Sequence, residues 1–325
     1  MKAGAPSVAR RISGVAAVVS CLLVRVLPAS GQTPDDLNAA CLIQTGMLQE
    51  CRVASVAPIV VAGHLGFLSG AGSQVAGTAS NLGTRVSSGP RLSFSARTSL
   101  LHAGAPDLSD PQGQRERSFL AQAFHVDATA GVFDGFRIMP TVGGFLSLDL
   151  TARAGLLFLP VEDHFSENVR SWSLGARVGI FREGFTVPGV SVSVARRFPG
   201  AVTYGDFGRG DAAEVLVDVS VTSWRATIGK DLYAIEFLAG VGIDDHSGTT
   251  TVRLPGLGFS TTVPGDVEGS RWLWFGSAAR TFSIVLTLAV EAGWAGGFDA
   301  TTAPTGVYDV SNGSPFGAFS LRLTI

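Results

Sequence analysis

The last seven residues of the chain alternate strictly between apolar and polar side chains. The odd positions of 319–325 are all apolar, and the even positions are serine, arginine and threonine. A period of two places one set of side chains on each face of a β-strand. The same alternation recurs along the chain from residue 89, so the sequence predicts an all-β fold whose strands have one apolar and one polar face.

About ten strands can be read from this pattern, an even number. The clearest segments are 92–100, 124–132, 146–156, 172–180, 190–194, 233–243, 284–294 and 319–325. In 213–229 the apolar positions change from odd (Val215 to Val221) to even (Trp224 to Ile228). This predicts either a β-bulge near Thr222, which would shift the face by one residue, or a turn that adds a strand.

Alternation alone would also suit a soluble β-sandwich. Two features favour a membrane barrel: most segments reach the 9–11 residues that a tilted membrane strand needs, and their connections alternate short and long. Short connections are predicted at 182–188, 230–231 and 280–282, with 134–141 the least regular of this set. Long ones are predicted at 102–118, 159–168, 199–212, 245–266 and 297–314.

Aromatic residues fall near the predicted strand ends, as in the aromatic girdles of membrane barrels. This places Trp172, Trp272 and Trp294 near the outer rim, and Trp224 and Tyr233 near the inner rim.

The C-terminal strand resembles the terminal strand of bacterial outer-membrane β-barrels, although it ends in Ile325 where that family usually has Phe or Trp. The resemblance implies a transmembrane, antiparallel, up-and-down barrel over 89–325, in contact with outer-membrane lipid. It also implies that barrel-assembly machinery reads the last strand. The barrel would have ten strands, or up to twelve if 69–88 or 250–262 contribute.

Composition agrees with this class. Charged residues make up only 15% of the chain, against about 25% in soluble domains, and the mean hydropathy is +0.33 without an uninterrupted apolar run of helical membrane-span length. A formal net charge of -2 gives no electrostatic case for nucleic-acid binding.

The N-terminus predicts export. Residues 1–31 have a basic start (Lys2, Arg10, Arg11), an apolar stretch and small residues before Gln32, which together are typical of a cleaved signal peptide. A lipoprotein-type site at Cys21 and a retained N-terminal anchor are the alternatives.

Residues 32–88 are predicted to form a periplasmic or plug segment and a linker. Cys41 and Cys51 suggest a structural disulfide in an exported chain. Because a straight helix would separate them by about 15 Å, the bond requires a turn, and Gly46 lies between them. We expect 53–68 to form a short helix in the lumen or at its periplasmic mouth, with an unpaired strand as the alternative, and 69–88 to be a linker.

Charged residues on the polar faces are expected to line the lumen, since an arginine facing lipid at mid-membrane costs about 2–4 kcal/mol. They are Arg97, Asp127, Asp149, Arg153, Arg177, Asp218, Arg225, Glu236, Arg271, Glu291 and Arg322. Such residues either line a channel or pair across a filled interior. The first function considered is therefore a channel or transporter for small solutes of unknown identity. The second is a closed structural or surface-interaction barrel that acts through its outer loops.

A third hypothesis is enzymatic. Asp163 and His164 lie in one predicted outer loop, and Asp244 and His246 lie at the start of another. The Asp-x-His spacing of the second pair resembles the omptin family of outer-membrane proteases, in which the acid orients an imidazole that activates water. The second Asp pair of that family has no counterpart here. No cofactor and no metal site are expected.

Overall fold

The computed structural model describes residues 33–84, 89–110, 112–138, 143–166, 168–255, 260–283, 285–298 and 308–325. The predicted signal peptide, 1–31, and its cleavage site before Gln32 lie outside the described residues.

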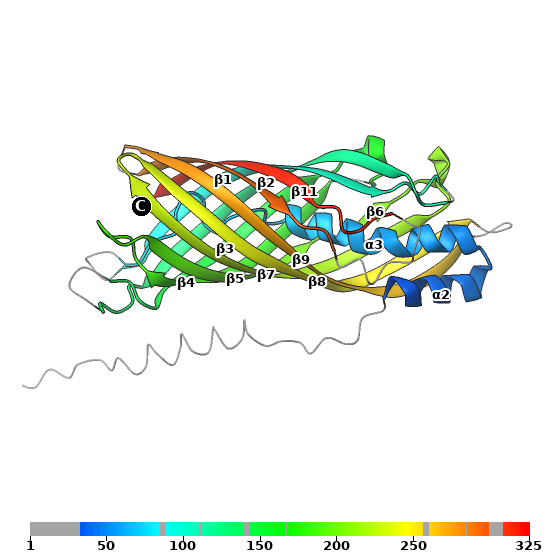
Figure 1. Cartoon of the computed structure of the whole chain (residues 1–325), viewed down its shortest axis with the longest axis horizontal. Helices are drawn as coiled ribbons and strands as arrows, with labels where there is room; N and C mark the ends of the chain where they lie inside the picture. Colours follow the sequence, from blue (N-terminus) through cyan, green and yellow to red (C-terminus); the bar gives the residue numbers. More distant parts are fainter. Residues whose placement is uncertain are drawn as a thin grey trace, which may run out of the picture. The chain divides into compact units, whose positions relative to one another are not determined.

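The chain forms a closed antiparallel barrel (Figure 1). Its strands are β1 (Arg91–Pro106), β2 (Glu116–Phe133), β3 (Ser147–Phe158), β4 (Val169–Phe181), β5 (Gly189–Pro199), β6 (Val202–Tyr204), β7 (Glu214–Leu232), β8 (Ile235–Pro255), β9 (Ser260–Phe282), β10 (Leu286–Ala295) and β11 (Ser314–Thr324). Consecutive strands pair, except β5 and β6; in addition β1 pairs with β11, and β5 pairs with β7. The short β6 continues the pairing of β5 along β7, so the barrel has ten strand positions. The predicted all-β, up-and-down barrel of about ten strands is confirmed.

The two ends of the barrel differ in their connections. The C-terminus and the tight turns β7–β8 and β9–β10 lie at one end, which we call the turn end. The opposite end, the loop end, carries the connections after β1, β3, β5 and β10, although the one after β1 is confined to 107–115 because β1 and β2 extend into the predicted loop at 102–118. The connection after β2, at 134–146, lies at the turn end and is the exception to the short turns there. The predicted loop at 245–266 is wrong, because most of these residues belong to β8 and β9, the longest hairpin of the barrel. Residues 250–262 thus lengthen two strands and do not add one.

Strand β7 is continuous, and neither the predicted bulge near Thr222 nor a turn occurs there. Odd residues face the interior along the whole strand, so Val215 to Val221 are buried inside and Asp218 is exposed on the outer face. The apolar residues change parity because the surroundings change along the strand. Towards the loop end the interior is apolar and the outer face is polar, and towards the turn end the reverse holds.

The same inversion occurs in β1 and β2. Inward residues of β1 are polar up to Ser99 and apolar from Leu101, and those of β2 change from Phe119, Ala121 and Ala123 to His125. An outer face that becomes polar indicates where the strands leave lipid for water.

Tryptophans lie near this change. Trp224 is a register neighbour of Ile243, which neighbours Trp272, and all three face outward. The prediction that Trp224 lies near the inner rim is therefore wrong, because the uninterrupted β7 places it in mid-strand. Trp294 is next to Trp274, which was not predicted.

The other two predicted girdle residues lie near strand ends. Trp172 faces outward, three residues after Val169, where β4 begins at the loop end, and it stacks on Phe198. Tyr233 is fully exposed in the β7–β8 turn, at the turn end.

Helix α2 (Pro34–Thr45) has local signals at both ends. Thr33 and Asp36 form a reciprocal capping box, Pro34 occupies the first turn, and Gly46 ends the helix with a left-handed φ of 72°. The hydrogen bonds from Thr33 keep the pKa of the Asp36 carboxyl below its usual value. The turn that follows allows α2 to fold back on the next helix.

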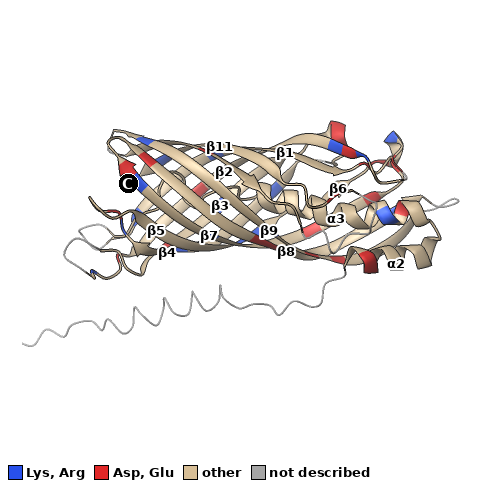
Figure 2. Cartoon of the chain, in the orientation of Figure 1, with Lys and Arg blue, Asp and Glu red and all other residues tan. Residues whose placement is uncertain are grey.

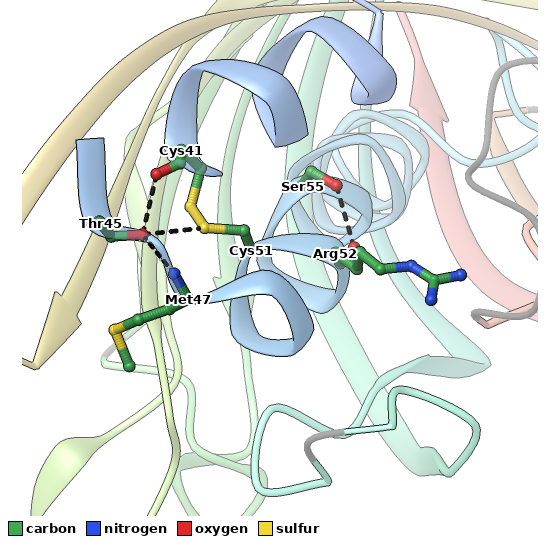
Figure 3. Close-up of a disulfide and its surroundings, with 6 residues drawn as sticks. All are labelled: Cys41, Thr45, Met47, Cys51, Arg52 and Ser55. Carbon is green, nitrogen blue, oxygen red and sulfur yellow. Dashed lines mark hydrogen bonds between the residues drawn. A yellow bond between two sulfur atoms is a disulfide. The ribbon is translucent and has the colours of Figure 1, made fainter. Parts of the chain in front are cut away.

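The predicted disulfide between Cys41 and Cys51 is confirmed, and it joins the two helices (Figure 3). Both cysteines are buried, and the Cα atoms are 5.6 Å apart because the chain turns at Gly46.

Helix α3 (Leu48–Leu68) lies inside the barrel against β7, β1, β8 and β9 (Figure 1). By length and composition it could cross a membrane, but 94% of its apolar window is buried in protein. A helix that is apolar on all sides needs a core around it. The inward apolar residues of the loop-end half supply that core.

The position of the lipid boundary can be tested with two arginines on the outer face. Val290→Arg, on the turn-end side of Trp294 where the outer face is apolar, is expected to lower the free energy of unfolding by about 2–4 kcal/mol. Asp218→Arg, on the polar side of the boundary, is expected to stay within about 0.5 kcal/mol of the native protein. Urea unfolding from lipid vesicles measures both, and equal costs would contradict the boundary.

The disulfide is expected to hold α2 and not the barrel. Replacing both cysteines by serine should lower the local opening free energy of residues 34–45 by about 2–4 kcal/mol, measured by hydrogen exchange. Ile43→Ser, at an exposed position of the same helix, is the control and should leave exchange unchanged. Loss of the folded barrel in the cysteine variant would contradict this separation.

Candidate functional site: the plugged lumen

We call residues 48–84 the plug. After α3 the chain continues as an extended segment, 69–84, through the polar half of the lumen towards the turn end. Among the described residues, its one sheet-type contact is the isolated bridge from Thr84 to Pro90, so the rest of its backbone has no sheet partner there. Groups buried in this way must find other hydrogen-bond partners.

Arginines that face the interior donate hydrogen bonds to the carbonyl groups of residues 71–73, the part of this segment that follows α3. Arg97 Nη1 donates to the oxygens of Ala71 and Ser73 at 2.8 and 2.9 Å. Arg225 Nε donates to Gly72 O at 3.2 Å. A guanidinium group has five N–H donors and can therefore serve several carbonyls at once.

Two further arginines do the same nearer the turn end. Arg177 donates to the carbonyl oxygens of Thr78 and Ser80 at 2.9 and 2.8 Å, and Arg322 donates to Ala76 O.

Inward carboxylates accept hydrogen bonds from the backbone N–H groups of the plug. Glu291 accepts from Ser73 N at 3.1 Å, and Asp149 accepts from Leu82 N at 3.0 Å. Glu236 accepts from Ala79 N at 3.3 Å. The side chains of the barrel thus replace both the donors and the acceptors of a neighbouring strand.

Asp134, just after β2, binds the end of the plug. It accepts from Thr84 N at 2.9 Å and pairs with Arg182 at 3.1 Å. Burial opposes ionisation of this carboxyl, but the hydrogen bonds from Thr84 and Arg182 outweigh it and keep its pKa below the usual value.

The interior charges also pair with one another. Asp244 lies between Arg225, at 2.8 Å, and Arg197, at 3.5 Å, and its side chain is fully buried. Asp149 pairs with Arg177 at 2.8 Å, while Asp127 pairs with Arg153. Removing one partner of such a buried pair typically costs about 3–5 kcal/mol.

Glycines let the plug backbone approach these side chains. A Cβ at Gly72, where φ is +76°, would lie 1.3 Å from Glu291 Oε1. A Cβ at Gly70 would lie 2.3 Å from Arg197 Nε. The glycines of this part of the sequence therefore reflect close packing in the lumen.

Most of the charged residues predicted to line the lumen face the interior. Arg97, Asp127, Asp149, Arg153, Arg177, Arg225, Arg271, Glu291 and Arg322 are buried there, and Glu236 is partly buried. Asp218 is the exception and lies on the outer face, because β7 keeps one register through its polarity change. Arg197 was missed, although it has the same parity as the inward Ser191 and Ser193 of β5.

Asp244 and His246 lie within β8 and face the interior, so their predicted place in an outer loop is wrong. Asp244 is held by the two arginines described above. His246 packs against Gly66 of α3 and edge-on to Phe298, with Nδ1 3.3 Å from Gly269 O. Neither side chain is open to a substrate in the surrounding water.

Asp163 and His164 lie at the loop end, in a short 3-10 turn and the residue after it. His164 Nδ1 contacts Asp211 and not Asp163. Asp211 also accepts from Asp206 N at 2.9 Å and pairs with Arg117 at 3.4 Å, so this group ties three loop-end segments together. Among the described residues, no group of three or more His, Cys, Asp or Glu side chains could hold a metal ion.

One polar hollow of about 330 Å³ lies at the turn end. Plug residues Thr78 and Ser80 to Leu82 form one wall, and Arg91, Arg182 and Arg322 contribute to the other. Figure 2 shows charged residues at both ends of the barrel and also within the strands, several of which are the inward residues described above.

Comparisons with known proteins bear only on architecture. No protein-family model matches the chain, and no curated sequence matches it. Among solved structures, the chain is similar to the outer membrane protease OmpT from Escherichia coli, with 10% identity, coverage of 73% of this chain and 96% of that one, and a TM-score of 0.32.

It is also similar to the transport unit of the autotransporter AIDA-I from Escherichia coli (7% identity, 83% and 99% coverage, TM-score 0.40). The toluene transporter TodX from Pseudomonas putida is a third such structure (8% identity, 77% and 96% coverage, TM-score 0.32). At these values the similarity assigns none of the three functions to this chain. The structure is that of a closed antiparallel β-barrel whose lumen is occupied by a segment of the same chain that precedes the strands.

Close packing at Gly72 can be tested against a matched glycine. Gly72→Ala and Gly46→Ala both force alanine into a left-handed conformation, but a Cβ at Gly46 meets nothing within 4 Å. Gly46→Ala should cost about 1–2 kcal/mol and leave the plug protected. Gly72→Ala should displace the extended segment and speed hydrogen exchange at Ser73, Ala79 and Leu82. Equal exchange in the two variants would contradict the docking described here.

Proposed function

We propose that the protein is a closed outer-membrane barrel, exported by its N-terminal signal and acting at the loop-end surface instead of conducting solutes. One observation carries the proposal: the plug occupies the lumen from the apolar half, where Gly63 meets Phe298, to Asp134 at the turn end. A channel needs a continuous water path through the lumen, and the plug fills the lumen where such a path would run.

The polar contacts of the plug support this function. Arginines and carboxylates that would attract ions in an open pore are bound to the plug backbone or to one another. They therefore stabilise a filled interior, which was the second of the functions considered from the sequence. The C-terminal strand is proposed to be read by the barrel-assembly machinery, as its alternation suggests. The proposal includes no enzymatic step.

Passage of a small solute is the second candidate. The polar hollow of about 330 Å³ at the turn end favours it, because a solute could enter there and meet the plug. In this case the plug would have to move before any solute crossed.

Conductance in planar bilayers separates the two candidates. The chain starting at Gln32 is expected to insert without steady openings, whereas a variant lacking residues 33–84 is expected to conduct. Heat-modifiable gel mobility confirms that each variant is folded. Should the deletion fail to fold, Gly72→Ala provides the displaced plug in a full-length chain. Steady openings of the intact protein that change with Glu291→Gln would overturn the closed-barrel proposal.

A further inference from the structure

Helix α2 and the C-terminal end of the plug lie at opposite ends of the barrel. Pro34 and Leu37 of α2 pack near Val267, in the loop-end part of the long β8–β9 hairpin. Thr84 binds Asp134 and bridges to Pro90, close to where Leu92 pairs with the C-terminal Ile325. The chain therefore runs through the whole lumen, from the loop end at α2 to the turn end at β1.

The order of contacts along the plug supports this path. His64 Nε2 donates to Gly104 O near the loop end of β1, and Arg97, further along β1 towards the turn end, donates to the carbonyl oxygens of Ala71 and Ser73. Arg177 and Asp149 then bind residues 78–82. Successive plug residues thus meet successive levels of the barrel.

In barrels of this type the short turns face the periplasm and the longer loops face the outside. We propose that the helical hairpin formed by α2 and α3 is presented on the outer surface of the cell, at the end of a segment that passes through its own barrel. The inference rests on the orientation assumed in the proposed function.

The hairpin has the properties of an exposed cap. Ile43 is 86% exposed and Leu48 is 54% exposed, while Cys41 and Cys51 are buried beneath them. A disulfide persists in an oxidising environment, which both the periplasm and the cell exterior provide, so the bond is compatible with either side and the position is inferred from the path of the chain. The disulfide keeps α2 folded onto α3 at the loop end, where the barrel does not enclose α2.

Single lysines can report which side of the membrane each position faces. Lys2 and Lys230 are the only lysines in the sequence, so an added lysine is easily mapped. Three exposed positions serve: Ile43→Lys in the hairpin, Val161→Lys at the loop end and Tyr233→Lys in a short turn. A membrane-impermeant amine reagent is applied to intact Gram-negative cells and to lysed cells, and modified peptides are identified by mass spectrometry.

The expected result is that residues 43 and 161 are modified in intact cells and residue 233 only after lysis. If residue 161 is modified in intact cells but residue 43 only after lysis, the hairpin is not on the surface and the inference is overturned while the orientation stands. If residue 233 is modified in intact cells and residue 161 is not, the orientation is inverted, and the proposed function fails with the inference.

Discussion

Hydrogen bonding of an extended backbone by buried arginines and carboxylates is the interaction on which this architecture depends. A strand in a sheet satisfies its backbone through neighbouring strands, but residues 69–84 lie inside a barrel whose strands are already paired with each other. Arg97, Arg177 and Arg322 donate to its carbonyls, and Glu291 and Asp149 accept from its N–H groups. Without these contacts the segment would leave buried polar groups unpaired, at a cost of about 1–3 kcal/mol each.

The apolar half of the lumen meets the opposite requirement, which is to bury an apolar helix. Helix α3 bonds most of its own backbone and is apolar over most of its surface, so it needs a largely apolar core, with His64 and the surroundings of Gly66 as the polar exceptions. The strands provide this core by reversing the polarity of their faces where they leave the lipid. Each half of the lumen therefore matches the part of the plug that it encloses: charged side chains surround the extended segment, and aliphatic ones surround the helix.

Much of this fold follows from period-two alternation, and the failures come from one limit of that pattern. Alternation identifies two faces of a strand but not the medium that each face meets. The pattern predicts that Asp218 faces the lumen, whereas Asp218 lies on the outer face and Val215 to Val221 are the inward residues, which pack on α3. The same limit explains the wrong prediction of a loop at Asp244 and His246. The outer face of β8 becomes polar there, and a polar outer face resembles the end of a membrane strand. The contacts between the plug and the lumen could not be predicted, since they join residues distant in sequence, such as Arg177 and Thr78.

The fit between the plug and the barrel has a consequence for the order in which the molecule is built. The two helices joined by Cys41 and Cys51 are wider than the extended segment that follows, and Gly70 and Gly72 already touch the barrel side chains there. A barrel that had already closed would leave no room for the disulfide-linked helical hairpin to pass through its lumen. For a hairpin that reaches the outer surface as proposed, β1 and β11 would have to pair around a segment that is already in place, so that barrel closure and enclosure of the plug would be one event.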